Sequence, residues 1–463
     1  MSFSSRLKGL KKKKQEQRAV LEGKVTNDFF TLVSVAKWNS LGFSFYDFLL
    51  PYILSQVFHA TGIQIGIIAS GTLFGTMISS LIAGYLADRM SKRKITIFGG
   101  LGRAGAYILF YITIAVVKSL PLLMTSAFLL GFVVGFFWVP YDALISQKSD
   151  KNIRSQAFGL RYSSMAIGII LGGAMGYGQF AFLNWVGPSL WTSNWMAIAP
   201  FLLYSPFLIY AVANVYACVI FLKKVDENSV YTRTEERDIE ESKQELELQA
   251  DDQANTQYGK LNPIFIIGII FLFFSLFLTA VNNMIAKPFI QIYLIENISN
   301  NPTSVVLAYA PGGLIAMILS PTLGKIADRL NPGLGITIFS IIGALMTFFL
   351  INVTNLIGFS LVFFVDAAFS TGENLLISNI FSRVSLKHRG KTIGLSTSIN
   401  NLGGMVGPIV GGILWDVFFQ KMPFIVSIFV ELALIAFYLI GLKLAGPYMA
   451  EKIDLESKMK GLE

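Results

Sequence analysis

The sequence predicts an all-α polytopic membrane protein with twelve transmembrane helices, arranged as two pseudo-symmetric bundles of six. The composition supports this, because 54% of residues are hydrophobic, 14% are charged and the mean hydropathy is +0.60. Soluble chains carry about 25% charged residues. A repeat supports the division into two bundles, since GYLADRMSKRK at 84–94 is followed half a chain later by GKIADRLNPGL at 324–334.

Apolar runs of about 20 residues, the length that crosses a bilayer, define the expected spans. They cover residues 30–57, 64–87, 95–117, 121–145, 157–178, 200–222, 262–291, 304–327, 334–354, 357–381, 392–415 and 423–445. The segment 179–199 holds Trp185, Trp191 and Trp195 and no charge. We expect it to be an external loop in the membrane interface, where tryptophan is enriched.

Lysine and arginine residues predict the orientation. They concentrate before the first span and in the turns that follow even-numbered spans, whereas the opposite loops offer only Lys118 and Lys421, with Lys287 near a helix end. Positive residues stay on the cytoplasmic side of a membrane. We therefore expect a multi-pass protein of the cell (plasma) membrane with both termini cytoplasmic. The net charge of +9 reflects this topology, and no nucleic-acid partner is expected.

Composition divides the chain into five segments. We expect a basic cytoplasmic segment at 1–28, a six-helix bundle at 29–222, a charged cytoplasmic linker at 223–260, a second six-helix bundle at 261–446 and a cytoplasmic tail at 447–463. Further phrases repeat in the same order: ALIS at 143–146 with LLIS at 375–378, and RSQAFGL at 154–160 with RGKTIGL at 389–395. Helices 4 and 5 are therefore expected to be repeated as helices 10 and 11.

The repeated turn resembles the major facilitator superfamily, and the resemblance covers nearly the whole chain. The family's loop after helix 2 is matched by Gly84, Asp88, Arg89, Lys92 and Arg93, with Ser91 where glycine is usual; the second copy keeps Gly324, Asp328 and Arg329. The resemblance implies that this motif helps to close the cytoplasmic side. The alternative is that its charges only anchor the topology. A glycine such as Gly84 would permit close helix contact.

Ionisable residues inside predicted spans are candidates for ion coupling, because they are costly in lipid and usually functional. Asp366 and Glu373 lie two turns apart on one face of helix 10, and Asp47 lies in helix 1. Carboxyl groups can exchange protons, so protons are the expected coupling ion. The alternative for the helix 10 acids is a buried structural pair with a basic residue elsewhere. Arg103 and Arg161 are expected to extend to the interface as anchors.

Candidate substrate contacts follow from the resemblance, which implies that helices 1, 4, 7, 10 and 11 line a central cavity. The polar and aromatic residues on these helices are Tyr46, Trp138, Tyr141, Asn282, Asn283, Asn374, Asn400 and Asn401. Simple packing is the alternative for each aromatic side chain. Glycines spaced by four in helices 5 and 11 are expected to serve helix packing.

Enzyme signatures are absent from the sequence. It contains no Walker A, HExxH, GxSxG or paired CxxC pattern, and Cys218 is its single cysteine. We therefore expect no catalytic residue, metal site or cofactor. The first hypothesis is a monomeric secondary active transporter that works by alternating access, as a proton-coupled symporter of a sugar or other small polar metabolite. The alternatives are a multidrug-type exporter of lipophilic cations and a non-transporting membrane receptor or scaffold.

Overall fold

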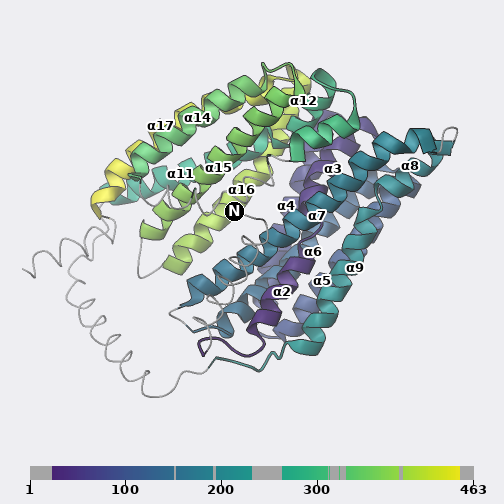
Figure 1. The fold of residues 1–463 in the computed structure, drawn as a ribbon. Coiled ribbons are helices and arrows are strands. Elements are labelled where there is room, and N and C mark those ends of the chain that lie inside the picture. Colours follow the sequence, from purple (N-terminus) through teal and green to yellow (C-terminus); the bar gives the residue numbers. More distant parts are fainter. Residues whose placement is uncertain are drawn as a thin grey trace, which may run out of the picture.

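The computed structural model is built from long helices (Figure 1). It describes residues 23–150, 153–190, 194–231, 263–310, 312, 323, 330–384 and 389–448. Within these ranges nine helices are long and apolar enough to cross a membrane, and the only β pairing is an isolated bridge between Val25 and Ser149.

The first bundle contains six helical spans, of which the first and sixth are interrupted and the third ends in the π-helical turn η1. They are α2 (Phe29–Asn39) with α3 (Phe43–Gln56), α4 (Gly62–Ala87), α5 (Lys92–Ile112) with η1 (Thr113–Val117), α6 (Leu120–Gln147), α7 (Arg154–Leu190), and α8 (Trp195–Leu203) with α9 (Pro206–Lys224). Contacts of α4 and α5 with α6, of α5 with α9, and of α2 with α7 and α9 hold this bundle together.

The second bundle repeats this plan. It contains α11 (Pro263–Ile285) with η5 (Lys287–Phe289) and α12 (Ile290–Asn297), then α14 (Pro332–Leu350), α15 (Leu356–Val384), α16 (Arg389–Val417) and α17 (Met422–Ala445), followed by the short η6 (Gly446–Tyr448). Residues 302–310 are helical at the start of the expected eighth span. Every one of the twelve predicted spans thus contains described helix.

The predicted interfacial loop at 179–199 is wrong. Residues up to Leu190 continue α7, and α8 begins at Trp195. The 37 residues of α7 extend about 55 Å at 1.5 Å per residue, well beyond a hydrocarbon core of about 30 Å. The added turns pack on α8, where a Cβ on Gly187 would lie 2.2 Å from the Trp195 ring.

Glycines join equivalent helices closely in both bundles. A Cβ on Gly172 of α7 would lie 1.8 Å from the carbonyl oxygen of Leu41, beside the break between α2 and α3. A Cβ on Gly411 of α16 would lie 2.0 Å from the carbonyl oxygen of Ile285, at the end of α11. The glycine rows of helices 5 and 11 therefore serve packing, as predicted, and each lies against the interrupted helix of its own bundle.

The interruption after α11 has a local cause. Pro288 lacks an amide hydrogen and cannot continue an α-helix unstrained, so the chain passes through η5 before α12 begins.

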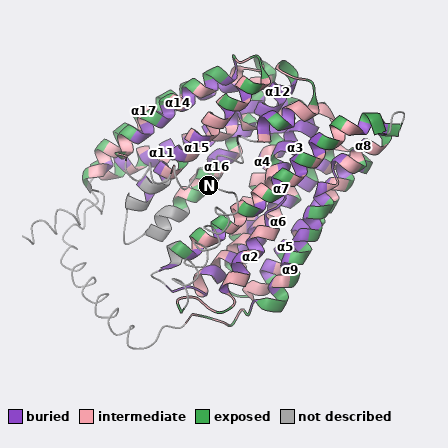
Figure 2. Ribbon diagram, viewed as in Figure 1, coloured by how far each residue is buried: buried purple, intermediate pink, exposed green. Residues whose placement is uncertain are grey.

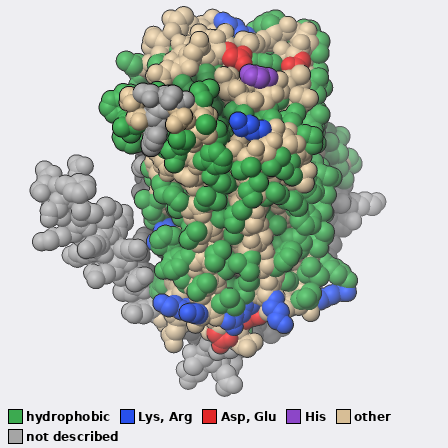
Figure 3. Space-filling view, turned by 90° about the vertical axis from the view of Figure 1, so that its right-hand side faces the viewer, with side chains coloured by type: hydrophobic (Ala, Val, Ile, Leu, Met, Phe, Trp, Pro, Cys, Tyr) green, Lys and Arg blue, Asp and Glu red, His purple; other side chains and the backbone are tan. Residues whose placement is uncertain are grey.

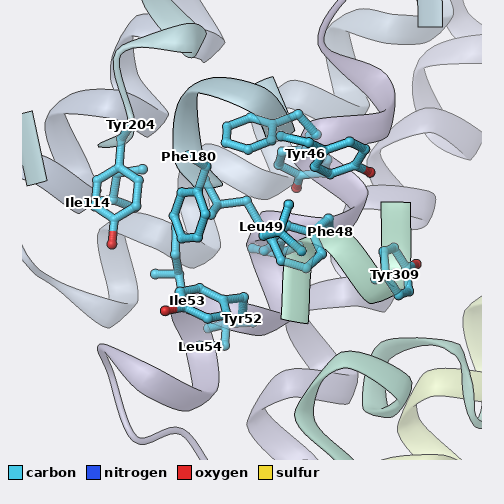
Figure 4. Close-up of a cluster of buried hydrophobic side chains, with 14 of the residues drawn as sticks. Tyr46, Phe48, Leu49, Tyr52, Ile53, Leu54, Ile114, Phe180, Tyr204 and Tyr309 are labelled. Carbon is cyan, nitrogen blue, oxygen red and sulfur yellow. The ribbon is translucent and has the colours of Figure 1, made fainter. Parts of the chain in front are cut away.

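The two bundles meet at one end of the molecule, near α3 and α12 (Figure 1). There α4 lies against α16, and a Cβ on Gly66 would be 2.2 Å from the Pro408 carbonyl oxygen. The Ser70 hydroxyl donates to the Met405 carbonyl oxygen at 2.6 Å. Aromatic side chains fill this end, with Phe48 of the first bundle 5.5 Å from Tyr309 of the second (Figure 4).

The same end carries an inter-bundle carboxylate contact at the N-terminus of α4. The Asp416 carboxylate of α16 accepts hydrogen bonds from the amides of Gly62 at 2.7 Å and Ile63 at 2.8 Å. A capping box between Thr61 and Gln64 satisfies the neighbouring amides. Asp416 therefore binds the two first-turn N–H groups that the box leaves free.

The outer surface of the helices is strongly hydrophobic. Buried residues follow the inward helix faces and exposed ones the outward faces (Figure 2). Large apolar side chains such as Leu81, Val212 and Ile357 are exposed. Figure 3 shows a broad hydrophobic belt with Lys and Arg side chains gathered at one end. Lipid would cover this belt, because a water-soluble protein rarely exposes so large an apolar patch.

Candidate functional site

A cavity of about 400 Å³ lies between the two bundles. The first bundle contributes Phe43, Ser44, Asp47 and Tyr177 from the first and fifth spans. The second bundle contributes polar side chains from α11, α14, α15 and α17. A volume of this size accommodates a small organic molecule.

The cavity lining carries more acid than base. The carboxyl groups are those of Asp47, Asp366, Glu373 and Glu431, and the single amine is that of Lys287. Lys287 pairs with Asp47 at 3.3 Å, which links the second bundle to the first. Both partners are substantially exposed to the cavity, at 42% and 57% of their side-chain surface. Three carboxyl groups therefore remain without an ion-pair partner among the described residues.

These three carboxyl groups all belong to the second bundle, and neutral groups solvate them. The Ser340 hydroxyl donates to Glu373 at 3.1 Å. Thr347 is within hydrogen-bonding reach of Asp366, and Asn282 within reach of Glu431. Glu373 is 4% exposed and Glu431 is 8% exposed. Buried carboxylates that repel one another are relieved when one of them binds a proton or a cation.

Glu431 is the cavity residue that the sequence analysis missed. It is the single acidic residue in the apolar helix Met422–Ala445, which is the same signal that identified Asp366 and Glu373. It lies on the twelfth span, outside the helices 1, 4, 7, 10 and 11 that the resemblance implies line the cavity. The structure places it in the cavity through α17, the twelfth span.

The predicted coupling residues Asp47, Asp366 and Glu373 meet in this cavity, together with Asn282 and Asn283. Asn374 lies beside the cavity wall, where its side-chain oxygen accepts from Asn283 at 3.4 Å. The other five predicted contacts do not line the cavity: Tyr46, Trp138, Tyr141, Asn400 and Asn401.

Tyr46 and Tyr141 are buried within the first bundle. The Tyr46 hydroxyl is 3.1 Å from the Thr72 hydroxyl, and its ring packs on Phe110. The Tyr141 hydroxyl donates to the Leu32 carbonyl oxygen at 2.6 Å. Both rings therefore act in packing, which was the alternative for each aromatic residue.

Trp138 belongs to a second polar cluster, between α6 and α7. Arg161 pairs with Asp142 at 3.0 Å, and its guanidinium lies 4.1 Å from the centre of the Trp138 ring. Arg161 is only 5% exposed. The expectation that it extends to the interface is wrong, because the Asp142 carboxylate and the aromatic face stabilise its charge inside the bundle.

Arg103 is also buried rather than exposed at the interface. Its side chain is fully inaccessible, bonds to the Asn39 side chain and lies 4.3 Å from the centre of the Phe43 ring. These contacts surround the break between α2 and α3. The guanidinium therefore supports the interrupted first span instead of anchoring α5 at the membrane surface.

The turn after α4 is held by local contacts. The Glu227 carboxylate accepts from the Lys92 amide at 2.6 Å and from the Ser91 hydroxyl, which caps α5. Arg89 lies over the Tyr85 ring. Arg93 donates to the Leu222 carbonyl oxygen. This turn is thereby tied to the segment that follows α9 in the same bundle.

No contact with the second bundle is found for this turn within the described ranges. A Cβ on Gly84 would meet no atom within 4 Å, and no described partner bonds the Asp88 carboxylate. The second copy of the motif, Gly324, Asp328 and Arg329, lies outside the described residues. Among the described residues, this motif makes no contact that joins the two bundles at the Asp88 end.

Comparison with known proteins decides the family. The profile of the Major Facilitator Superfamily matches residues 38–385 and 272–458. The chain belongs to this superfamily. It is a transporter with the superfamily's fold, not an enzyme, which confirms the resemblance, the fold class and the absence of a catalytic role.

Individual relatives are distant but span most of the chain. The Quinolone resistance protein NorA of Staphylococcus aureus is 22% identical over 396 residues, covering 85% of this chain and 90% of NorA. The 3-(3-hydroxy-phenyl)propionate transporter of Escherichia coli is 23% identical over 365 residues, covering 78% of this chain and 79% of that protein.

Solved structures show the same fold. A bacterial homologue of the human lysosomal transporter Spinster, in an inward-facing and occupied conformation, superposes with a TM-score of 0.68 at 14% identity, covering 90% of this chain and 96% of that one. The nucleoside transporter NupG superposes with a TM-score of 0.63 at 14% identity, covering 89% of this chain and all of NupG.

Proposed function

We propose that this transporter exchanges protons for an amphiphilic organic cation. The observation that carries the proposal is the lining of the cavity between the bundles, where four carboxyl groups face one amine that is already paired. A cationic substrate and a proton would compete for the same carboxyl groups. This competition is the simplest physical basis for obligatory exchange.

The aromatic part of the lining favours an apolar or aromatic substrate body. Phe43, Tyr177, Tyr309, Phe363 and Phe424 surround the acidic groups. Aromatic faces attract organic cations, whereas an anionic substrate would need an unpaired Lys or Arg. The geometry thus favours the multidrug-type alternative over the small polar metabolite. The name of the NorA relative, a quinolone resistance protein, agrees with an exporter of drug-like molecules.

Proton coupling rests on Asp366 and Glu373, supported by the absence of a nucleotide-binding motif in the sequence. Both side chains lie on α15 and line the cavity without a described cationic partner. Asp47 is assigned a different role, that of holding the two bundles together, because its ion pair with Lys287 links them. Substrate or proton binding that breaks this pair would favour separation of the bundles around it.

The proposed mechanism is alternating access in the plasma membrane. The positive-inside rule supports an orientation with the Asp88 end of the molecule, and both termini, in the cytoplasm. The bundles are then closed at the outer end by Asp416 and the Phe48–Tyr309 contact. Rocking of the bundles around the cavity would open the outer end and bring Asp88 toward the second bundle. We propose the monomer as the working unit, with the segments at 29–222 and 261–446 as its rocking bundles and 223–260 as their tether.

The test is transport by the purified chain in proteoliposomes, with ethidium as a fluorescent cation and an imposed pH gradient. Asp366→Asn and Glu373→Gln should each reduce gradient-driven ethidium transport by about tenfold or more. Asp226→Asn is the matched control, because the exposed Asp226 carboxylate lies outside the cavity and accepts from the Asn228 amide of its own segment.

Three results would contradict the proposal in different ways. Unchanged gradient-driven transport in both cavity variants would exclude these carboxyl groups from coupling. Transport of sugars but not of ethidium would restore the polar-metabolite hypothesis. Ethidium binding without any flux would favour the receptor or scaffold hypothesis.

A further inference from the structure

The recess around Glu431 is a buried acidic part of the cavity, formed between α17 and α14. Glu431 projects from α17 toward α14, where a Cβ on Gly343 would lie 2.1 Å from its Oε1 atom. No Lys or Arg lies within ion-pair distance of Glu431 among the described residues. The carboxyl group therefore occupies space that is open only because residue 343 has no side chain.

An unpartnered acceptor lies next to this carboxyl group. Asn282 of α11 is 8% exposed, lines the same cavity and is within hydrogen-bonding reach of Glu431. Its Oδ1 atom is buried and has no hydrogen-bond partner among the described residues. Leaving a buried acceptor unpaired is unfavourable. A ligand that brings N–H donors would satisfy Asn282 Oδ1 and the Glu431 carboxylate together.

The chemistry of the recess indicates an organic donor. In the described part of the chain no group of three or more His, Cys, Asp or Glu side chains is placed to hold a metal ion. A protonated primary or secondary amine offers both a positive charge and N–H groups. A quaternary or phosphonium cation offers charge alone and cannot donate to Asn282.

We propose that Glu431 and Asn282 form the subsite that receives the protonated amine group of the substrate. This proposal rests on the proposed exchange of organic cations, and it makes α17 a specificity-determining helix. The aromatic part of the substrate lies toward Phe424 and Phe363 in the wider cavity. Amines that can donate hydrogen bonds then bind in preference to cations that cannot.

The test compares two cations on the purified full-length protein by titration calorimetry. Tryptamine carries an aromatic body and a primary ammonium group, whereas tetraphenylphosphonium has no N–H group. Glu431→Gln should weaken tryptamine binding by about tenfold or more and change tetraphenylphosphonium binding by less than about threefold. Gly343→Ala keeps every charge but displaces the carboxylate, and it should show the same selective loss.

Gly105→Ala is the matched control for the glycine variant, because a Cβ there meets no atom within 4 Å. It should leave both affinities unchanged. Equal weakening of both cations by Glu431→Gln would overturn the subsite while leaving cation binding intact, since it would indicate only a loss of general negative charge. Unchanged tryptamine binding would also overturn it. Failure of the wild-type protein to bind either cation would remove the proposed function and the subsite with it.

Discussion

The contact between Asp416 and the N-terminus of α4 predicts how strongly the two bundles are held together at the end where they meet. Asp416→Asn removes the negative charge but keeps the size of the side chain and one acceptor oxygen. Two charge-assisted hydrogen bonds, at 2.7 and 2.8 Å, are weakened. The favourable interaction of the carboxylate with the positive end of the helix is lost as well.

The magnitude follows from these terms after a correction for solvent. Hydrogen bonds to charged groups contribute about 1.5–3 kcal/mol each when buried, and the helix terminus adds about 0.3–1 kcal/mol. Asp416 is exposed, so these energies are reduced. We expect a loss of about 1.4 kcal/mol, which shifts the equilibrium toward the state open at the Asp416 end by about tenfold.

Distance measurements between spin labels test this shift. The chain has a single cysteine, Cys218, which is buried, so Cys218→Ser provides the background for labels at Met90→Cys and Leu334→Cys. Both positions are exposed and belong to different bundles. In Asp416→Asn, the population with a short label separation should grow at the expense of the long one. The control Asp226→Asn, whose carboxylate bonds only within its own segment among the described residues, should match the background protein. The reasoning is refuted if Asp416→Asn gives that same distance distribution.

Three further predictions concern stability and the motif turn. Asp28→Asn should lower the free energy of unfolding by about 3 kcal/mol near neutral pH, because it leaves the fully buried Lys148 ammonium without its carboxylate. Burial pushes the pKa of Asp28 upward, but hydrogen bonds from Lys148, Thr26 and the Asp226 amide outweigh it and hold this pKa below the ordinary value. The contribution of Asp28 to stability is therefore present above about pH 4 and disappears as the pH falls through the lowered pKa. Melting curves of the wild-type protein and Asp28→Asn should accordingly converge in acid. Gly172→Ala should lower the melting temperature, since its Cβ would overlap a backbone carbonyl, whereas Gly178→Ala, where a Cβ meets nothing within 4 Å, should stabilise α7 by up to about 1 kcal/mol. Gly84→Leu should leave the melting temperature nearly unchanged but slow transport, because its side chain would be crowded only when the Asp88 end closes; equal transport rates would argue against gating by this motif.

The sequence was sufficient for the architecture because lipid imposes strong constraints. A bilayer-spanning helix must be apolar along its length, so the spans could be predicted from hydropathy alone. The repeated Gly-x-x-x-Asp-Arg turn added the family. The long α7 helix was predicted incorrectly beyond residue 178, because an uncharged, tryptophan-rich stretch has the same composition in an interfacial loop as in a protruding helix.

The cavity was predicted only in part, because the sequence does not determine the rotation of each helix about its own axis. A residue's place along a span follows from the sequence, but the direction that its helix face points depends on packing. Asp47 and Asp366 face the cavity, whereas Tyr46, one residue before Asp47, points into the first bundle. Glu431 could have been found, because a lone acid in an apolar span is costly wherever it lies. The position of Glu431 in the cavity could not have been predicted, because it depends on the space beside Gly343.

The glycine contacts of α7 and α16 have a mechanical consequence. Each long helix lies directly on the backbone of an interrupted helix, at Leu41 in one bundle and at Ile285 in the other. Backbone against backbone leaves no flexible side chain to absorb a displacement. Each pair of helices is therefore expected to move as one rigid unit. The interruption of the shorter helix lies near the cavity, so tilting the unit displaces Asp47 in one bundle or Lys287 in the other. Motion of either helix pair as a rigid body would thus be transmitted to the Asp47–Lys287 ion pair, because each pair carries one of its two partners.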